Sequence, residues 1–186
     1  MIFHTEFNPD SAVYHDMHSF RMRARLDEDL LEKAVNQTIA RHPELRTSFD
    51  LRRFSVPLQL VHKRVPANIA FEDLSHLAGE ELRVAVEQRL EEEKQLHFNY
   101  EQGPLHRFHI IRRSDEEFQF MLVFHHAILD GWSAATLLTE LFQRYLALLH
   151  NPDFAPEPPL TMSFRDFVSL EKMTLESEQA QDYWNR

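Results

Sequence analysis

Two adjacent histidines stand at the end of a nearly continuous apolar stretch and are the residues best suited to chemistry. The run Phe118–Phe124 leads directly into His125-His126, and Asp130-Gly131 follow after three apolar residues. Histidine titrates near neutral pH and can exchange a proton with an amine or a hydroxyl. Because successive side chains of a strand point to opposite faces, only one of the two imidazoles can reach a given ligand. We expect the other imidazole to pack into the scaffold.

Asp130 and Gly131 extend this candidate site. The Asp130 carboxylate can orient an imidazole, or it can hold an arginine and brace the turn. Gly131 permits close approach of a ligand where the N-terminus of a helix presents unpaired N–H groups. From the residues alone, a purely structural histidine pair is the alternative. A metal site is disfavoured because the two histidines diverge and the chain contains no cysteine.

The segments on either side of the histidines predict a strand-to-helix connection. Phe118–Phe124 is predicted to be a central strand buried on both faces, joined to the strand Leu105–Arg113 by a short turn at residues 114–117. An amphipathic helix follows Gly131, with Ser133 as its predicted N-cap. The apolar side chains of this helix form one stripe: Leu137, Leu138, Leu141, Phe142, Tyr145 and Leu149.

The first part of the chain alternates strand and helix patterns. A strand is predicted over residues 18–26, where arginines alternate with apolar residues and face solvent. Asp27 is predicted to cap a helix that ends before Pro43. Three further short strands are predicted at residues 45–51, 56–65 and 71–74.

A second helix is predicted over residues 77–96, with Leu96 facing inward and Glu91–Glu93 facing solvent. Residues 151–160 are rich in proline and predict an extended connector, after which Ser163 begins a last helix. These patterns predict an α/β class, in an α+β two-layer arrangement with a mixed sheet covered by helices.

Composition excludes several classes of protein. The chain has 186 residues, 43% of them hydrophobic and 15 of them Phe, which is enough to build a core. The formal net charge of −10 argues against nucleic acid as a partner, and only 3 glycines leave no room for a glycine-rich phosphate loop. No apolar run is long enough for a membrane helix, and no signal pattern is present. We therefore expect a soluble, cytoplasmic protein with no membrane partner.

Three motifs resemble those of the condensation domains of nonribosomal peptide synthetases, and along the chain they follow each other in the same order as in that family. Residues Phe124–Ser133 resemble the HHxxxDG core motif, and Arg41–Phe49 resemble the RHExLRTxF motif, with Pro43 in place of Glu. Phe164–Val168 are similar to the YxDFA motif, with Phe in place of Tyr. The resemblance implies a two-lobed fold like that of chloramphenicol acetyltransferase. A tunnel would separate the lobes, and the phosphopantetheine arms of two carrier proteins would enter it from opposite ends.

The resemblance also implies a reaction, in which a carrier-bound acceptor amine attacks a carrier-bound donor thioester and an amide forms. His126 would take the amine proton or orient the amine. Asp130 would shape the catalytic loop through a salt bridge, and Gly131 would lie against the thioester. His125 and Arg46 would support the site structurally. Trp132 and Ser133, at the start of the helix, would contact substrate.

The motifs cover only the first half of such a domain. We expect residues 1–186 to be a single N-terminal lobe, without the C-terminal lobe, that condenses poorly or not at all by itself. The expected partners are donor and acceptor carrier domains, an adjacent adenylation domain and the missing lobe, with no tightly bound cofactor and no metal. Phe3–Thr5 and Asn8–Ser11 resemble the subtype that takes a D-configured donor.

Two alternatives remain open at this point. One is a stand-alone or relict acyltransferase of the same fold that uses coenzyme A thioesters. The other is a non-catalytic lobe that docks a carrier protein.

Overall fold

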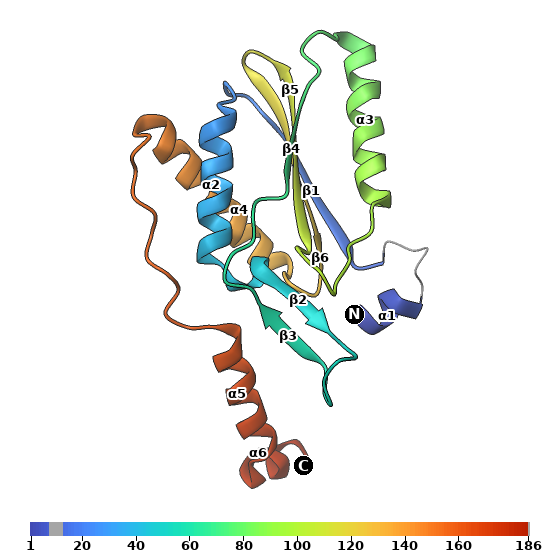
Figure 1. Ribbon diagram of the computed structural model, residues 1–186, viewed down its shortest axis with the longest axis vertical. Coiled ribbons are helices and arrows are strands. Elements are labelled where there is room, and N and C mark those ends of the chain that lie inside the picture. The colour runs from blue at the N-terminus through green and yellow to red at the C-terminus, as the bar shows by residue number, and fades with distance from the viewer. Residues whose placement is uncertain (8–12, 186) are drawn as a thin grey trace. The chain divides into compact units, whose positions relative to one another are not determined.

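The computed structural model describes residues 1–7 and 13–185, in two compact units, Met1–Pro156 and Glu157–Arg186 (Figure 1). Part of the segment behind the donor-subtype prediction, residues 8–11, lies outside the described residues. In the first unit the elements are, in chain order, α1 (Ile2–Phe7), β1 (His15–Met22), α2 (Glu28–Arg41), the short 3-10 helix η1 (Pro43–Arg46), β2 (Thr47–Asp50), β3 (Leu58–Val61), β4 (Ile69–Asp73), α3 (Gly79–Gln95), β5 (His106–Ser114), β6 (Glu117–His125) and α4 (Gly131–His150). The second unit holds α5 (Phe164–Leu175) and α6 (Glu178–Trp184).

The main sheet of the first unit has the strand order β1-β6-β5-β4. β6 pairs antiparallel with β1 and with β5, whereas β4 pairs parallel with β5. β2 and β3 form a separate antiparallel pair. The predicted α/β class with a mixed sheet is confirmed, and so is the hairpin of β5 and β6.

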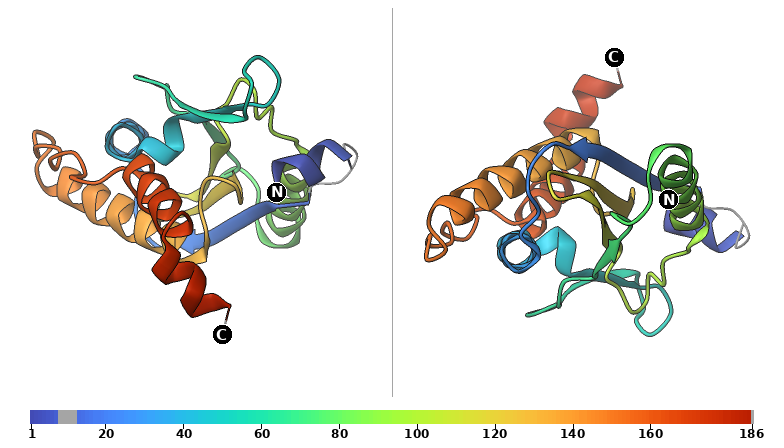
Figure 2. Two further views of the ribbon diagram at one scale, coloured as in Figure 1. Left: turned by 90° about the horizontal axis from the view of Figure 1, so that it is seen from below. Right: turned by 90° about the horizontal axis from the view of Figure 1, so that it is seen from above.

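Helices cover both faces of this sheet. α2 and α4 lie side by side on one face, and α3 lies on the other (Figure 2). The face under α2 and α4 holds the larger core, which includes Phe118, Phe120 and Leu122 of β6. Met121 of the same strand packs on the opposite face with Val86 of α3. α3 therefore adds a third layer to the two that were expected, because its apolar side covers the second face of the sheet.

Both long helices of the larger core begin at an aspartate. Asp27 caps α2, as predicted, and its side chain accepts a hydrogen bond from the Leu30 N–H at 3.0 Å. The predicted cap of α4 was wrong: Asp130 caps this helix, which begins at Gly131, and Ser133 lies in its first turn. An aspartate three residues ahead of Ser133 competes for the same role and satisfies the Ser133 N–H.

The first predicted strand was displaced along the chain. β1 spans His15–Met22 and not residues 18–26. It pairs with β6 over its whole length, from His15 opposite His125 to Met22 opposite Phe118. β1 stops at Met22, opposite Phe118, one residue short of the position opposite Glu117, where β6 begins. Apolar and basic residues continue to alternate after Met22, but they are no longer part of the strand.

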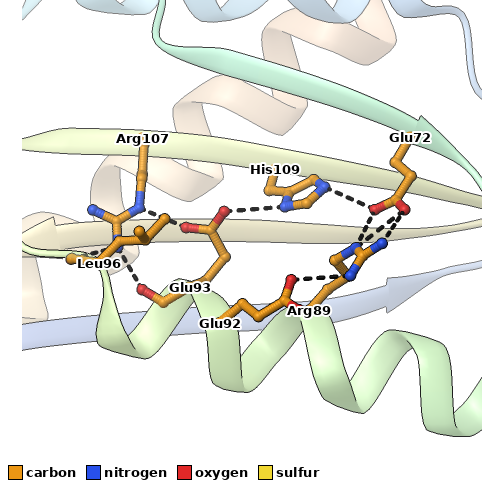
Figure 3. Close-up of polar contacts among 7 residues, drawn as sticks. All are labelled: Glu72, Arg89, Glu92, Glu93, Leu96, Arg107 and His109. Carbon is orange, nitrogen blue, oxygen red and sulfur yellow. Dashed lines mark hydrogen bonds and ion pairs between the residues drawn. The ribbon is translucent and has the colours of Figure 1, made fainter.

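α3 is attached to the sheet by charged side chains as well as apolar ones (Figure 3). Glu93 accepts a hydrogen bond from Arg107 Nε of β5 at 2.5 Å, and the other Glu93 oxygen lies 3.1 Å from Nδ1 of His109. Arg89 donates to Glu72 of β4 at 2.9 Å. The prediction that Glu93 faces solvent was therefore wrong, because this position of the helix turns toward β5.

Leu96 was also placed incorrectly by the sequence pattern, because it follows the end of α3 and is 53% exposed. Its carbonyl instead accepts a hydrogen bond from Arg107 at 2.9 Å. In the second unit, the predicted capping box of the last helical segment is confirmed, with Ser163 and Asp166 bonding reciprocally at the start of α5. No helix of the described residues is long and apolar enough to cross a bilayer.

Candidate active site

The two histidines lie where β6 ends between two neighbouring chain segments. The His125 N–H donates to the Leu105 carbonyl at 2.9 Å, just before β5. The His126 N–H donates to the Tyr14 carbonyl at 2.7 Å, just before β1. Their backbones are thus fixed from opposite sides, and alternation sends their side chains to opposite faces of the sheet.

His125 is locked into the scaffold. Its side chain is buried, Nδ1 accepts a hydrogen bond from the Ala127 N–H at 3.0 Å, and Nε2 lies 3.1 Å from Oγ1 of Thr5. Because Nδ1 is an acceptor, the ring proton sits on Nε2 and is donated to Thr5. Burial, assisted by nearby positive charge, lowers the pKa of His125 to about 4. Both ring nitrogens are occupied, and the ring is neutral at physiological pH.

His126 is arranged differently. Its side chain is 32% exposed, yet Nδ1 is buried and lies 3.1 Å from Oδ2 of Asp16 in β1. The two atoms are within ion-pair distance without the alignment of a hydrogen bond. The accessible part of the ring therefore lies away from Nδ1, so that an edge of a titratable ring is available to a ligand.

Asp130 is occupied by the helix that it caps. Its Oδ1 accepts the Ser133 N–H at 2.7 Å, and the carboxylate is exposed. This hydrogen bond, followed by one from the Ser133 side chain and by the nearby His126, lowers the pKa of the Asp130 carboxyl. Within the described part of the chain, the salt bridge expected for Asp130 is not formed. The carboxylate instead fixes the turn that joins His126 to α4.

Gly131, Trp132 and Ser133 form the first turn of α4 and are all exposed, with Trp132 at 86%. A Cβ added to Gly131 would have no neighbour within 4 Å. The first unit itself therefore does not require a glycine at this position, where the space above the helix N-terminus is open.

Arg46, at the end of η1, donates hydrogen bonds to backbone carbonyls of the described residues. Nε donates to the Ile39 carbonyl at 3.1 Å, and the terminal nitrogen donates to the carbonyls of His62 and Lys63. Through these contacts, Arg46 joins the end of α2 to the segment after β3 and so braces the fold.

Sequence reasoning missed two polar side chains that face the imidazoles, Thr5 at His125 and Asp16 at His126. Asp16 was missed because the predicted strand began at His18, which left Asp16 outside any strand. Asp16 could have been identified only from the antiparallel register of β1 with β6, which places it opposite Phe124. Thr5 lies in the short helix α1, for which the sequence carries no such register. Among the described residues, no three His, Asp or Glu side chains are close enough together to hold a metal ion.

Comparison with known proteins places these observations in a family. The family model described as "Condensation domain" matches residues 1–186. The chain is 33% identical over 186 residues to the AMB antimetabolite synthetase AmbE of Pseudomonas aeruginosa, covering 99% of this chain and 9% of that protein. It is also 33% identical over 186 residues to a component of the linear gramicidin synthase of Brevibacillus parabrevis, covering 99% of this chain and 4% of that protein.

Among solved structures, the starter condensation domain of the rhizomide synthetase RzmA matches with a TM-score of 0.84 at 21% identity. This match covers 98% of the chain and 45% of the solved one. The chain belongs to the condensation-domain family of nonribosomal peptide synthetases. It spans less than a tenth of the length of the two synthetases and a little under half of the solved condensation domain.

Proposed function

We propose that residues 1–186 form the lobe of a condensation domain that carries the histidine motif and promotes amide formation between two carrier-bound substrates. One observation supports this most strongly. Of the two motif histidines, His125 has both ring nitrogens occupied, whereas His126 keeps an accessible ring edge beside an open helix N-terminus. The family motif and the accessibility of the two rings both indicate His126 as the catalytic residue.

The reaction joins an acceptor amine to a donor acyl group. The amine nitrogen attacks the thioester carbonyl, the C–N bond forms, and the C–S bond breaks. His126 accepts the proton that the amine loses, or hydrogen-bonds the amine and orients its lone pair, and the departing sulfur ends as a thiol. No covalent link to the enzyme is required, because the thioester already carries an activated acyl group.

The surroundings of His126 supply the remaining elements of the proposal. Asp130 holds the turn, and the N–H groups beginning at Gly131 offer partial positive charge to the thioester carbonyl as negative charge develops there. Trp132 and Ser133, exposed in the same turn, are the proposed substrate contacts. Arg46 and His125 support the backbone at a distance from the reacting atoms.

The proposed partners follow from this reaction. Both substrates would arrive on the phosphopantetheine arms of carrier domains, with an adenylation domain loading the acceptor carrier in the cytoplasm. A second lobe would supply the opposite wall of the tunnel and exclude water from the amine. We expect residues 1–186 alone to show little condensation with pantetheine-linked donor and acceptor. Efficient condensation by these residues alone would contradict the need for a second lobe.

The function is tested in the full gene product that carries residues 1–186. Carrier-bound and coenzyme A-bound donors are supplied separately, and the amide product is measured by mass spectrometry. We expect product from the carrier-bound donor, with the rate reduced about 10²-fold or more in His126→Ala. His150→Ala, at the far end of α4, is the matched control and should retain the wild-type rate. Product from coenzyme A thioesters alone would favour the stand-alone acyltransferase.

A further inference from the structure

Asp16 occupies a defined position relative to His126. In the antiparallel register of β1 and β6, Asp16 lies opposite Phe124, two residues before His126. The hydrogen bond from the His126 N–H to the Tyr14 carbonyl continues this register past the end of β6. Asp16 and His126 are therefore diagonal neighbours on the same face of the sheet, a separation that a carboxylate and an imidazole can bridge.

The contact between the two side chains concerns one ring nitrogen. Nδ1 of His126 is buried, and the Asp16 carboxylate is 3.1 Å away. Asp130 is a second carboxylate with an electrostatic interaction with His126, but its Oδ1 accepts the Ser133 N–H. The Asp16 side chain is 49% exposed, so its carboxylate stays in contact with water and does not carry the cost of full burial.

A neutral imidazole carries its proton on one nitrogen and a lone pair on the other. If the lone pair were on Nδ1, it would face a carboxylate oxygen at 3.1 Å with no proton between them. That arrangement is repulsive, whereas a proton on Nδ1 is attracted to the carboxylate. The charge of Asp16 therefore favours the tautomer with the proton on Nδ1 and the lone pair on Nε2.

We propose that Asp16 is a positioning residue, which keeps the ring proton of His126 on Nδ1 and presents Nε2 as the acceptor for the substrate amine. The proposal rests on the function proposed above and deepens it. The two histidines then differ in tautomer as well as in exposure, because the hydrogen bonds of His125 place its proton on Nε2. Asp16 acts only through His126 and contacts no reacting atom.

The first experiment measures the tautomer directly in the 186-residue chain. Long-range nitrogen–proton NMR spectra in mildly alkaline buffer distinguish the protonated from the unprotonated ring nitrogen of each histidine. We expect the Nδ1–H form to predominate for His126 in the wild type and a mixture of tautomers in Asp16→Asn. Asp115→Asn, in the exposed turn between β5 and β6, is the control and should leave the His126 signals unchanged.

The His125 signals report whether the variants are folded, because its Nε2–H tautomer is fixed by hydrogen bonds to Thr5 and from the Ala127 N–H, in which Asp16 takes no part. A His126 that is predominantly Nε2–H in the wild type would overturn the proposal. So would a tautomer that does not change in a folded Asp16→Asn chain.

The second experiment measures condensation in the full gene product. Asp16→Asn should lower kcat on the order of tenfold with little change in KM, because the fraction of correctly oriented His126 falls while substrate contacts remain. Asp16→Glu should recover part of the rate. If His126→Ala is inactive and Asp16→Asn has the wild-type kcat, the proposal for Asp16 fails and the proposed function stands. If His126→Ala is fully active, the proposed function itself fails.

Discussion

The adjacent residues His125 and His126 have the same chemistry but different surroundings, and the surroundings determine what each can do. Both ring nitrogens of His125 are occupied, and burial lowers its pKa to about 4, so that the ring is neutral at neutral pH. His126 exposes the ring edge away from Asp16. Of these two neighbours in the chain, His125 is therefore a scaffold residue and His126 is the proposed proton acceptor.

Gly131 provides a test of whether the open space above α4 is used by a substrate. A Cβ there meets nothing within 4 Å, so Gly131→Ala should keep the free energy of unfolding or raise it by up to about 1 kcal/mol. Condensation should nevertheless fall about tenfold, because the added methyl occupies the place proposed for the thioester. Thermal unfolding and the condensation rate measure the two effects.

Gly79→Ala is the opposite control, because the φ of Gly79 is +54° and alanine is strained there. This variant should lose stability on the order of 1 kcal/mol and keep its condensation rate after folding. A Gly131→Ala enzyme with the wild-type rate would show that no substrate approaches this position.

From the sequence, only those parts of the candidate site that lie close together along the chain could be predicted. Strand alternation predicted that one of the two histidines packs into the scaffold, as His125 does, whereas Asp130 and Gly131 stay predicted site residues. The partner of His126 could not be found in this way. Asp16 lies 110 positions earlier in the numbering of the chain, and only the pairing of β1 with β6 brings it near.

α3 illustrates, at the level of elements, how a charged run can be misread. Glu91, Glu92 and Glu93 are consecutive, but successive residues of a helix point in different directions. Glu91 pairs with Lys94 on the solvent side, whereas the Glu93 side chain is only 12% exposed and bonds Arg107 and His109 of β5. The hydrogen bond from His109, followed by that from Arg107, lowers the pKa of the Glu93 carboxyl. Two of the three acidic residues were thus placed correctly, and the third holds the helix to the sheet.

Replacing Glu93 tests that attachment. Glu93→Gln should lower the free energy of unfolding by about 2 kcal/mol, because Arg107 would keep its largely buried charge without a carboxylate partner. Glu91→Gln, which breaks only an exposed pair two positions earlier, should change it by less than about 0.5 kcal/mol. Urea unfolding of the two variants makes the comparison, and equal losses would contradict the bridging role of Glu93.

Three histidines are expected to make the stability of the first unit fall at acidic pH. Burial is the main cause that lowers the pKa of His15, His106 and His125 from 6.5 to about 4 in each case. Unfolding restores the ordinary pKa, so the unfolded chain binds more protons between pH 6.5 and about 4. Stability is therefore fully present above pH 6.5 and falls as the pH drops through this range. The lowered pKa of carboxyls such as Asp130 acts in the same direction at still lower pH.

His106 allows one of these contributions to be isolated. It is fully buried, and neither of its ring nitrogens has a hydrogen-bond partner among the described residues. His106→Leu should reduce the slope of unfolding free energy against pH by up to about 1.4 kcal/mol per pH unit between pH 6.5 and 4. Denaturant unfolding at a series of pH values provides the slope, and an unchanged slope would contradict a neutral, buried His106.

The fold class could be predicted from the sequence, but the pairing of the strands and the placement of the helices on the sheet could not. Strong periodic patterns indicated α2, α4 and the β5–β6 hairpin with nearly correct bounds. The parallel pairing of β4 with β5, and the covering of the second face by α3, depend on contacts between distant segments. Such contacts are set by tertiary packing, for which a single sequence has no local signal.

The central claim is that His126 promotes attack of a carrier-bound amine on a carrier-bound thioester. The most direct measurement is single-turnover transfer in the full gene product with both carriers already loaded, because adenylation and loading then play no part. We predict that the wild type forms the amide on the acceptor carrier, and that His126→Ala lowers the transfer rate about 10²-fold or more and leaves both carriers loaded. Transfer at the wild-type rate by a folded His126→Ala protein would contradict the claim.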